Sequence, residues 1–237
     1  MLVHLLRSHA DICSHDEVFS APGTVGGMTG TYLLKRRADP NFAERMAAEK
    51  DRDPIKFLYK IVLDLQGKKA VCFKIKHDEL VRPEYKMLRD EIVNDQDFRI
   101  IHLRRENLLR RYLSHHIANY VTRVTLAVRG QTVPEIQPVV LDPQECKRDF
   151  EEILAREGEF AELFAQHPGF RISYEEMITP GSEKLQSLLD FMGVPRQELT
   201  TTTQKLGCDD LRRVITNFDE LRSYFSGSPF SRFFDDV

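Results

Sequence analysis

Hydrophobic residues at helical spacing open the chain. Residues 1–8 read MLVHLLRS, in which the leucines recur at the interval of one helical face, so this segment is predicted to be a helix. No capping residue precedes it, and the pattern resembles the interior of a helix already under way. From there to Gly30 the chain is predicted to be a long loop, because Pro22 and several glycines interrupt regular structure. A loop of this length is typical of a functional site.

Helix and strand patterns then alternate. A helix is predicted over 53–67, where an Asp-Pro pair supplies the N-cap and first turn and a glycine follows the apolar face. The runs AVCFKIK (70–76) and RIIHL (99–103) are short and rich in β-branched and aromatic residues, so both are predicted strands. A helix over 84–93 separates them. The order strand, helix, strand predicts a parallel right-handed crossover, with both strands in one sheet and helices on its faces.

The second half of the chain is predicted to be mainly helical. We expect helices over 106–128, 144–165, 182–192, 208–215 and 217–225, and a strand over 170–174. Three phenylalanines near the C-terminus belong either to the core or to a docking patch: Phe230, Phe233 and Phe234. The alternation of elements predicts a single α/β domain over residues 1–237.

Composition narrows the class of protein. The chain has 237 residues, of which 41% are hydrophobic, and a net charge of -3 that does not favour nucleic acid as a partner. Its four cysteines are widely separated and form no metal-binding or disulfide pattern, so we expect reduced thiols, no metal and a cytoplasmic location. The sequence contains neither an apolar run of about 18 residues nor a signal-peptide pattern, so no transmembrane segment is expected.

An arginine pair follows the second predicted strand. Ligands of parallel sheets collect at the carboxyl ends of strands, near the N-terminus of the following helix, and Arg104 and Arg105 stand at that place. A guanidinium there can bind a phosphate, and Ser114, about two turns into the helix, can reach the same anion. The alternative is a solvated cationic face, with Arg110 and Arg111, that pairs with nearby acids.

The order of several segments resembles the sulfotransferases that use 3'-phosphoadenosine 5'-phosphosulfate (PAPS), especially the bacterial carbohydrate and lipopolysaccharide type. The similar segments are LLRSHADICSHDEVF, VCFKIK, IIHLRRENLLRRYLSHHIA, RISYEEMITPGSEKLQSLLDFMGVP and ITNFDELRSYFSGSPFSRFF. The resemblance implies a P-loop-like parallel sheet flanked by helices. It also implies that PAPS donates a sulfuryl group to a hydroxyl of a carbohydrate or glycolipid, without a metal.

The resemblance also implies which residues bind the cofactor. Arg105 and Ser114 would hold its 3'-phosphate. Because the two arginines are adjacent, Arg104 is the alternative to Arg105. Lys205 falls where family members have a loop over the nucleotide, although the same stretch could be a linker. Tyr174 and Glu175 resemble a segment that ends a strand near the cofactor, and we expect them to be structural, with Glu175 holding backbone or an arginine.

Sulfuryl transfer needs a base beside the acceptor hydroxyl and positive groups beside the sulfonate. The resemblance implies Glu17 as the base, with His15 and Asp16 in reserve. Without the resemblance, these three would be polar loop residues or a helix cap. Lys74 could point its ammonium at the active-site end of its strand, or extend into solvent.

The resemblance further implies a strand and a phosphate loop before the first helix, and the sequence contains no such loop. We therefore expect the numbered chain to begin just after the loop that holds the phosphosulfate. Two functions follow: an active sulfotransferase, or a catalytically inactive relative that binds a partner as a scaffold. The sequence specifies neither the acceptor nor whether the chain forms a homo-oligomer.

Overall fold

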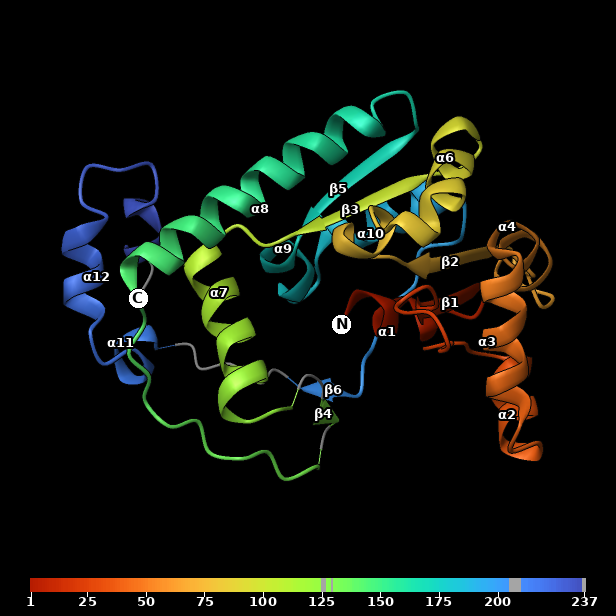
Figure 1. Cartoon of the computed structure of the whole chain (residues 1–237), viewed down its shortest axis with the longest axis horizontal. Helices are drawn as coiled ribbons and strands as arrows, with labels where there is room; N and C mark the ends of the chain where they lie inside the picture. Colours follow the sequence, from red (N-terminus) through yellow and green to blue (C-terminus); the bar gives the residue numbers. More distant parts are fainter. Residues whose placement is uncertain (125–126, 129, 205–209, 236–237) are drawn as a thin grey trace. The chain divides into compact units, whose positions relative to one another are not determined.

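The computed structural model describes residues 1–124, 127–128, 130–204 and 210–235. The chain forms two compact units, and Figure 1 labels most of their helices and strands. The first unit contains residues 1–103, 160–172 and 176–201, and the second contains 104–159, 173–175 and 202–237.

A parallel strand pair lies near the start of the first unit. Helix α1 (Leu2–Arg7) is confirmed, and strand β1 (Ile12–Glu17) follows it and pairs with β2 (Ala70–Lys74). The prediction of a loop as far as Gly30 is therefore wrong for 12–17. Its letters ICSHDE look too polar for a strand, but the structure buries Ser14 and His15 and satisfies them with hydrogen bonds.

Helices surround this pair within the first unit. The predicted helix over 53–67 is shorter than expected. It consists of α4 (Pro54–Phe57) and a π-helical turn, η1 (Leu58–Val62), and it ends at Val62. Asp53 caps it as predicted, because its carboxylate accepts a hydrogen bond of 2.9 Å from the Lys56 N–H. The other helices that begin in this unit are α2 (Thr31–Ala38), α3 (Phe42–Arg52), α5 (His77–Leu80), the 3₁₀ turn η2 (Pro83–Tyr85), α6 (Lys86–Asn94) and α10 (Glu183–Met192).

The strands are distributed differently from the prediction. Strand β3 (Ile100–Arg104) pairs with β5 (Gly169–Ser173), not with β2. Within the described residues the sheets are therefore three separate two-stranded pairs, the third being β4 (Ala127–Val128) with the antiparallel β6 (Thr203–Gln204). The prediction that 70–76 and 99–103 share one sheet is wrong, because β1 pairs with β2 and β5 pairs with β3. The coarser class holds: the fold is mixed α/β with a parallel strand pair flanked by helices.

The second unit is built on an aromatic core. Its helices and helical turns are α7 (Leu108–His116), the π-helical turn η3 (Ile117–Val121), most of α8 (Pro143–Leu163), the first turn of α9 (Tyr174–Ile178), α11 (Leu211–Val214), α12 (Phe218–Tyr224) and the 3₁₀ turn η4 (Ser231–Phe234). The long helix predicted over 106–128 thus ends at Val121.

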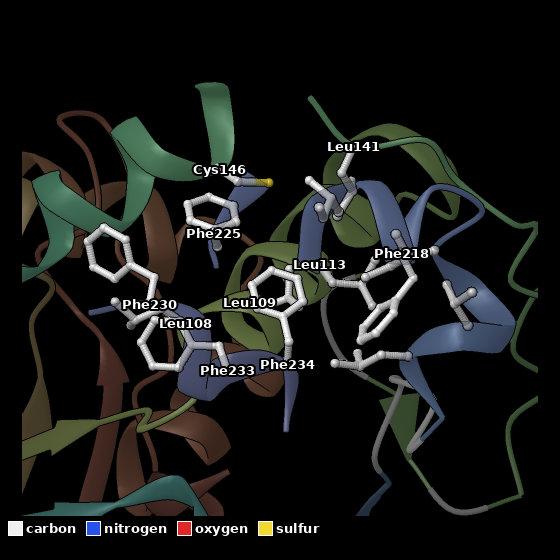
Figure 2. Close-up of a cluster of buried hydrophobic side chains, with 14 of the residues drawn as sticks. Leu108, Leu109, Leu113, Leu141, Cys146, Phe218, Phe225, Phe230, Phe233 and Phe234 are labelled. Atoms are coloured by element: carbon white, nitrogen blue, oxygen red, sulfur yellow. The ribbon is translucent and has the colours of Figure 1, made fainter. Parts of the chain in front are cut away.

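Phe150 lies within this core, with its ring centroid 5.4–5.5 Å from those of Phe225, Phe230 and Phe233. Figure 2 shows the rings of Phe225, Phe230 and Phe233 together with the leucines of α7. Phe230, Phe233 and Phe234 are buried, so they are core residues and not a docking patch. Across the described part of the chain, no helix has the length and apolarity needed to cross a membrane.

Candidate functional site

The carboxyl edge of the β1–β2 pair brings a carboxylate and two ammonium groups together. Both strands run in the same direction, so Glu17 and Lys74 end them at one edge, and the two are register partners. Lys74 Nζ donates a hydrogen bond of 2.5 Å to Glu17 Oε1. Lys76 Nζ lies 3.1 Å from Glu17 Oε2, so each carboxylate oxygen faces its own lysine.

A β-bulge gives Glu17 this position. The register shifts between His15 and Glu17, which leaves Asp16 as the extra residue of β1. The Asp16 N–H donates to the Gly27 carbonyl at 2.9 Å, and Arg7 donates to the carbonyls of Ser14 and Gly27, both at 2.9 Å. The loop after β1 is therefore tied back against the strand, which fixes the backbone on which Glu17 stands.

Gly27 permits this close approach. A Cβ at this position would lie 2.1 Å from the Cβ of Asp16, and the residue has φ +55°, which favours glycine.

The lysines hold Glu17 in its ionised form. Burial opposes ionisation, but hydrogen bonds and charge attraction from Lys74 and Lys76 outweigh it and lower the pKa of Glu17. The pKa of Lys76 is raised because Glu79 and Glu17 outweigh the effect of burial. The edge therefore presents an unprotonated carboxylate between two cations, with the Glu17 side chain 30% exposed. This arrangement can accept a proton and can also bind an anion.

The two reserve bases differ in accessibility. His15 is fully buried, accepts a hydrogen bond of 3.1 Å from the Thr29 N–H at Nδ1, and has its pKa lowered to about 4, mainly by burial. It is neutral at pH 7 but closed to solvent. Asp16 is 31% exposed and lies 3.9 Å from His4 Nε2.

In the second unit, Arg105 is held by two neighbours. Its guanidinium carbon lies 4.4 Å from the centre of the Tyr174 ring, and its Nε lies 3.5 Å from Glu175 Oε1. Glu175 Oε2 also accepts a hydrogen bond of 3.1 Å from the Glu106 N–H. This confirms the expectation that Glu175 holds backbone or an arginine, and it holds both. The guanidinium of Arg105 is thus held by Tyr174 and Glu175.

Ser114 and Arg104 lie in the same unit as Arg105. Ser114 is half-buried on α7, six residues after the first residue of the helix, which is about 9 Å along its axis. Arg104 is exposed at the end of β3. Burial raises the pKa of the Glu157 carboxyl, although Arg104 and Arg111 oppose that rise.

Acids do pair with some of these arginines, as the alternative interpretation expects. Arg111 Nη1 donates to both carboxylate oxygens of Asp149, at 2.9 and 2.6 Å. Arg105 forms a looser ion pair with Glu175, through the single contact of 3.5 Å between Nε and Oε1. Lys205 lies outside the described residues.

Sequence reasoning missed Lys76 as a partner of Glu17. The signal was present in the pattern KIK, because residues two apart on an extended chain lie on one side. Among the described residues, no group of three or more His, Cys, Asp or Glu side chains is placed to hold a metal ion.

One known protein shows a partial similarity to this chain. Over 99 residues the chain is 28% identical to nodulation protein H of Rhizobium tropici, and the match covers 41% of this chain and 40% of that protein. The chain thus matches about two fifths of the relative's length. No family model matches the chain, and no solved structure does.

Proposed function

We propose that this protein is a sulfotransferase that moves a sulfuryl group from PAPS to a hydroxyl of a carbohydrate or glycolipid. Two similarities support the class: the order of sequence segments that resembles PAPS-dependent enzymes, and the partial match to nodulation protein H, a sulfotransferase. The observation that carries the proposal is the placement of Glu17 between Lys74 and Lys76 at the carboxyl edge of a parallel strand pair.

In this proposal Glu17 is the general base. Its carboxylate takes the proton of the acceptor hydroxyl while the hydroxyl oxygen attacks the sulfur, and the bond from sulfur to the phosphate oxygen breaks. The products are the sulfate ester and 3'-phosphoadenosine 5'-phosphate. Lys74 and Lys76 stabilise the negative charge on the sulfonate and the leaving oxygen. When an ammonium turns from Glu17 to the sulfonate, the pKa of Glu17 rises and the carboxylate becomes a stronger base.

Arg105 and Ser114 are the proposed ligands of the cofactor's 3'-phosphate, with Arg104 as the alternative to Arg105. The stacking of Arg105 on Tyr174 supports this role, because an arginine that is already oriented loses less conformational entropy on binding. Lys205 is proposed as a further ligand of the nucleotide.

Two measurements test the proposal. Isothermal titration calorimetry with 3'-phosphoadenosine 5'-phosphate compares the wild type with Arg105→Ala and Arg104→Ala, and we expect the first variant to lose about tenfold or more in affinity. Equal affinity for Arg105→Ala would remove Arg105 from the site. Transfer of labelled sulfate from PAPS to a panel of sugars and glycolipids then compares the wild type with Glu17→Gln. The variant should lose about 100-fold or more in turnover, and full turnover would exclude Glu17 as the base.

A non-catalytic scaffold is the second candidate. It is favoured by the mutual neutralisation of the charges, since Glu17 already pairs with both lysines and Arg105 with Glu175 without a ligand. A scaffold would show no sulfate transfer to any acceptor and an affinity for 3'-phosphoadenosine 5'-phosphate that is weak or absent.

A further inference from the structure

Helix α2 (Thr31–Ala38) has one buried side chain, Tyr32, and its first residue is also held, because the N–H and the hydroxyl of Thr31 donate to Gln66 Oε1 at 2.6 and 2.9 Å. Tyr32 is 5% exposed, its ring stacks on that of Phe42 with 6.4 Å between centroids, and its hydroxyl donates to Asp64 at 3.3 Å. Every other residue of the helix is exposed. Figure 1 shows α2 immediately before α3 along the chain.

The outward face of α2 carries two leucines, an alanine and one arginine. Successive residues of a helix are rotated by about 100°, so the direction opposite Tyr32 lies between Leu34 and Arg37, with Leu33 and Ala38 beside them. Leu34 is 63% exposed and Leu33 is 40% exposed.

Basic residues surround these leucines. Lys35, Arg36 and Arg37 are consecutive. Arg37 lies on the outward face between Leu33 and Leu34, whereas Lys35 and Arg36 lie beyond its two edges, nearer to the direction of Tyr32. Within the described parts of the chain, none of the three forms an ion pair, and Lys35 makes its one contact through Nζ, 5.3 Å from the centre of the Tyr32 ring. The nearest acid in sequence, Asp39, is already paired with Arg45. The charge of α2 is therefore available to an external anion.

We propose that α2 docks on an anionic lipid bilayer. Leu33 and Leu34 enter the boundary between headgroups and acyl chains, while Lys35, Arg36 and Arg37 bind the lipid phosphates. A soluble polyanion would use the basic residues alone, whereas the paired exposed leucines match a surface with an apolar layer beneath its charges. One short helix gives weak and reversible attachment. The proposal does not depend on the sulfotransferase assignment.

The absence of tryptophan from the chain allows a direct test. Leu34→Trp places the single tryptophan of the variant on the proposed docking face, and the tryptophan emission, excited at a wavelength that tyrosine does not absorb, should shift to the blue with vesicles of phosphatidylglycerol and phosphatidylcholine but not with phosphatidylcholine alone. Met87→Trp is the matched control, because Met87 is 70% exposed on α6, and its emission should not shift. No shift for Leu34→Trp, or an equal shift with neutral vesicles, would overturn the proposal.

Vesicle co-sedimentation tests the charges. The triple variant Lys35→Gln/Arg36→Gln/Arg37→Gln should bind anionic vesicles at least about tenfold more weakly than the wild type. The control Arg52→Gln/Lys56→Gln/Lys60→Gln removes the same charge from other exposed positions and should bind as the wild type does. Equal losses in both variants would show a non-specific charge effect and would contradict the proposal.

The leucines distinguish a bilayer from other anionic partners. Leu33→Ser/Leu34→Ser should lose vesicle binding and keep any binding to heparin, with an unchanged circular dichroism spectrum. Retention of full vesicle binding by this variant would overturn the proposal in favour of a soluble polyanion or an acidic protein.

Discussion

Glu17 and Lys74 meet across parallel strands at a shift in their register, with 2.5 Å between Glu17 Oε1 and Lys74 Nζ. The pair ends both strands, and Lys76 supplies a second cation to the same carboxylate. Because the lysines outweigh burial in setting the pKa of Glu17, the stability of the first unit should depend on pH in a defined direction.

Glu17→Gln tests this dependence. A carboxyl whose pKa is lowered by folding contributes stability that is fully present above its ordinary value of 4.5 and is lost as the pH falls through the lowered value. The wild type should therefore be more stable than the variant by about 1 kcal/mol at pH 7, and the difference should vanish in strong acid. Urea unfolding of the wild type and the variant at pH 7 and at pH 2 measures the difference in stability at each pH. Glu198→Gln, at an exposed position, should show no such difference, and a Glu17→Gln effect that persists in acid would contradict an origin in the lysine pairing.

Glu175→Gln should strengthen nucleotide binding if Arg105 holds a phosphate. The amide keeps an oxygen for the Glu106 N–H but removes the charge that competes for Arg105. We expect calorimetry to show affinity for 3'-phosphoadenosine 5'-phosphate rising by about threefold to tenfold, because the arginine no longer exchanges one anion for another. In the double variant with Arg105→Ala, the gain should disappear. Weaker binding in Glu175→Gln alone would mean that the carboxylate supports the site.

Gly27→Ala should destabilise the first unit strongly. Its methyl group would lie 2.1 Å from the Asp16 Cβ, so the loop must leave the strand. Gly23→Ala is the matched control, since Gly23 also has a positive φ but has no atom within 4 Å of an added Cβ. Thermal unfolding should show a cost of about 1 kcal/mol for Gly23→Ala, from backbone strain alone, and at least about 3 kcal/mol for Gly27→Ala. Similar costs would mean that the close approach does not hold the loop.

Lys50→Met should expose the importance of a buried amino group. Lys50 Nζ is fully buried and donates to the Ala21 carbonyl at 2.6 Å and to the Tyr85 hydroxyl at 2.8 Å. Methionine has a similar shape but leaves both oxygens without this donor, at a cost of about 2 to 3 kcal/mol in the free energy of unfolding. Urea unfolding should show a change of no more than about 0.5 kcal/mol for Lys56→Met, which alters an exposed lysine. A Lys50→Met protein of wild-type stability would show that the hydrogen bonds of Lys50 to Ala21 and Tyr85 do not stabilise the fold.

Local pattern predicted the helices better than it predicted the sheets. The helices expected over 144–165 and 182–192 match α8 (Pro143–Leu163) and α10 (Glu183–Met192), because their apolar spacing acts within a few residues. Strand pairing depends on segments far apart in the sequence, and β1 escaped notice because its buried residues include a serine and a histidine. Because the sequence pattern does not predict β1, it leads to the wrong pairing of β2 with β3.

The sequence also predicts only part of the candidate site. Resemblance indicated Glu17 and the holding role of Glu175, whose contact with Arg105 the structure confirms. It did not indicate Lys76 beside Glu17. The pattern KIK places Lys74 and Lys76 on one side of an extended chain, but the position of Glu17 opposite them follows from the register of β1 against β2.

The bulge at Asp16 also affects how this chain should be aligned with others. Asp16 has no counterpart in β2, while His15 pairs with Phe73 and Glu17 with Lys74 on either side of it. A homologous strand that is one residue shorter can therefore keep its carboxylate opposite the lysine. Alignments that forbid a gap at this position would displace Glu17 by one column and count a retained carboxylate as a substitution.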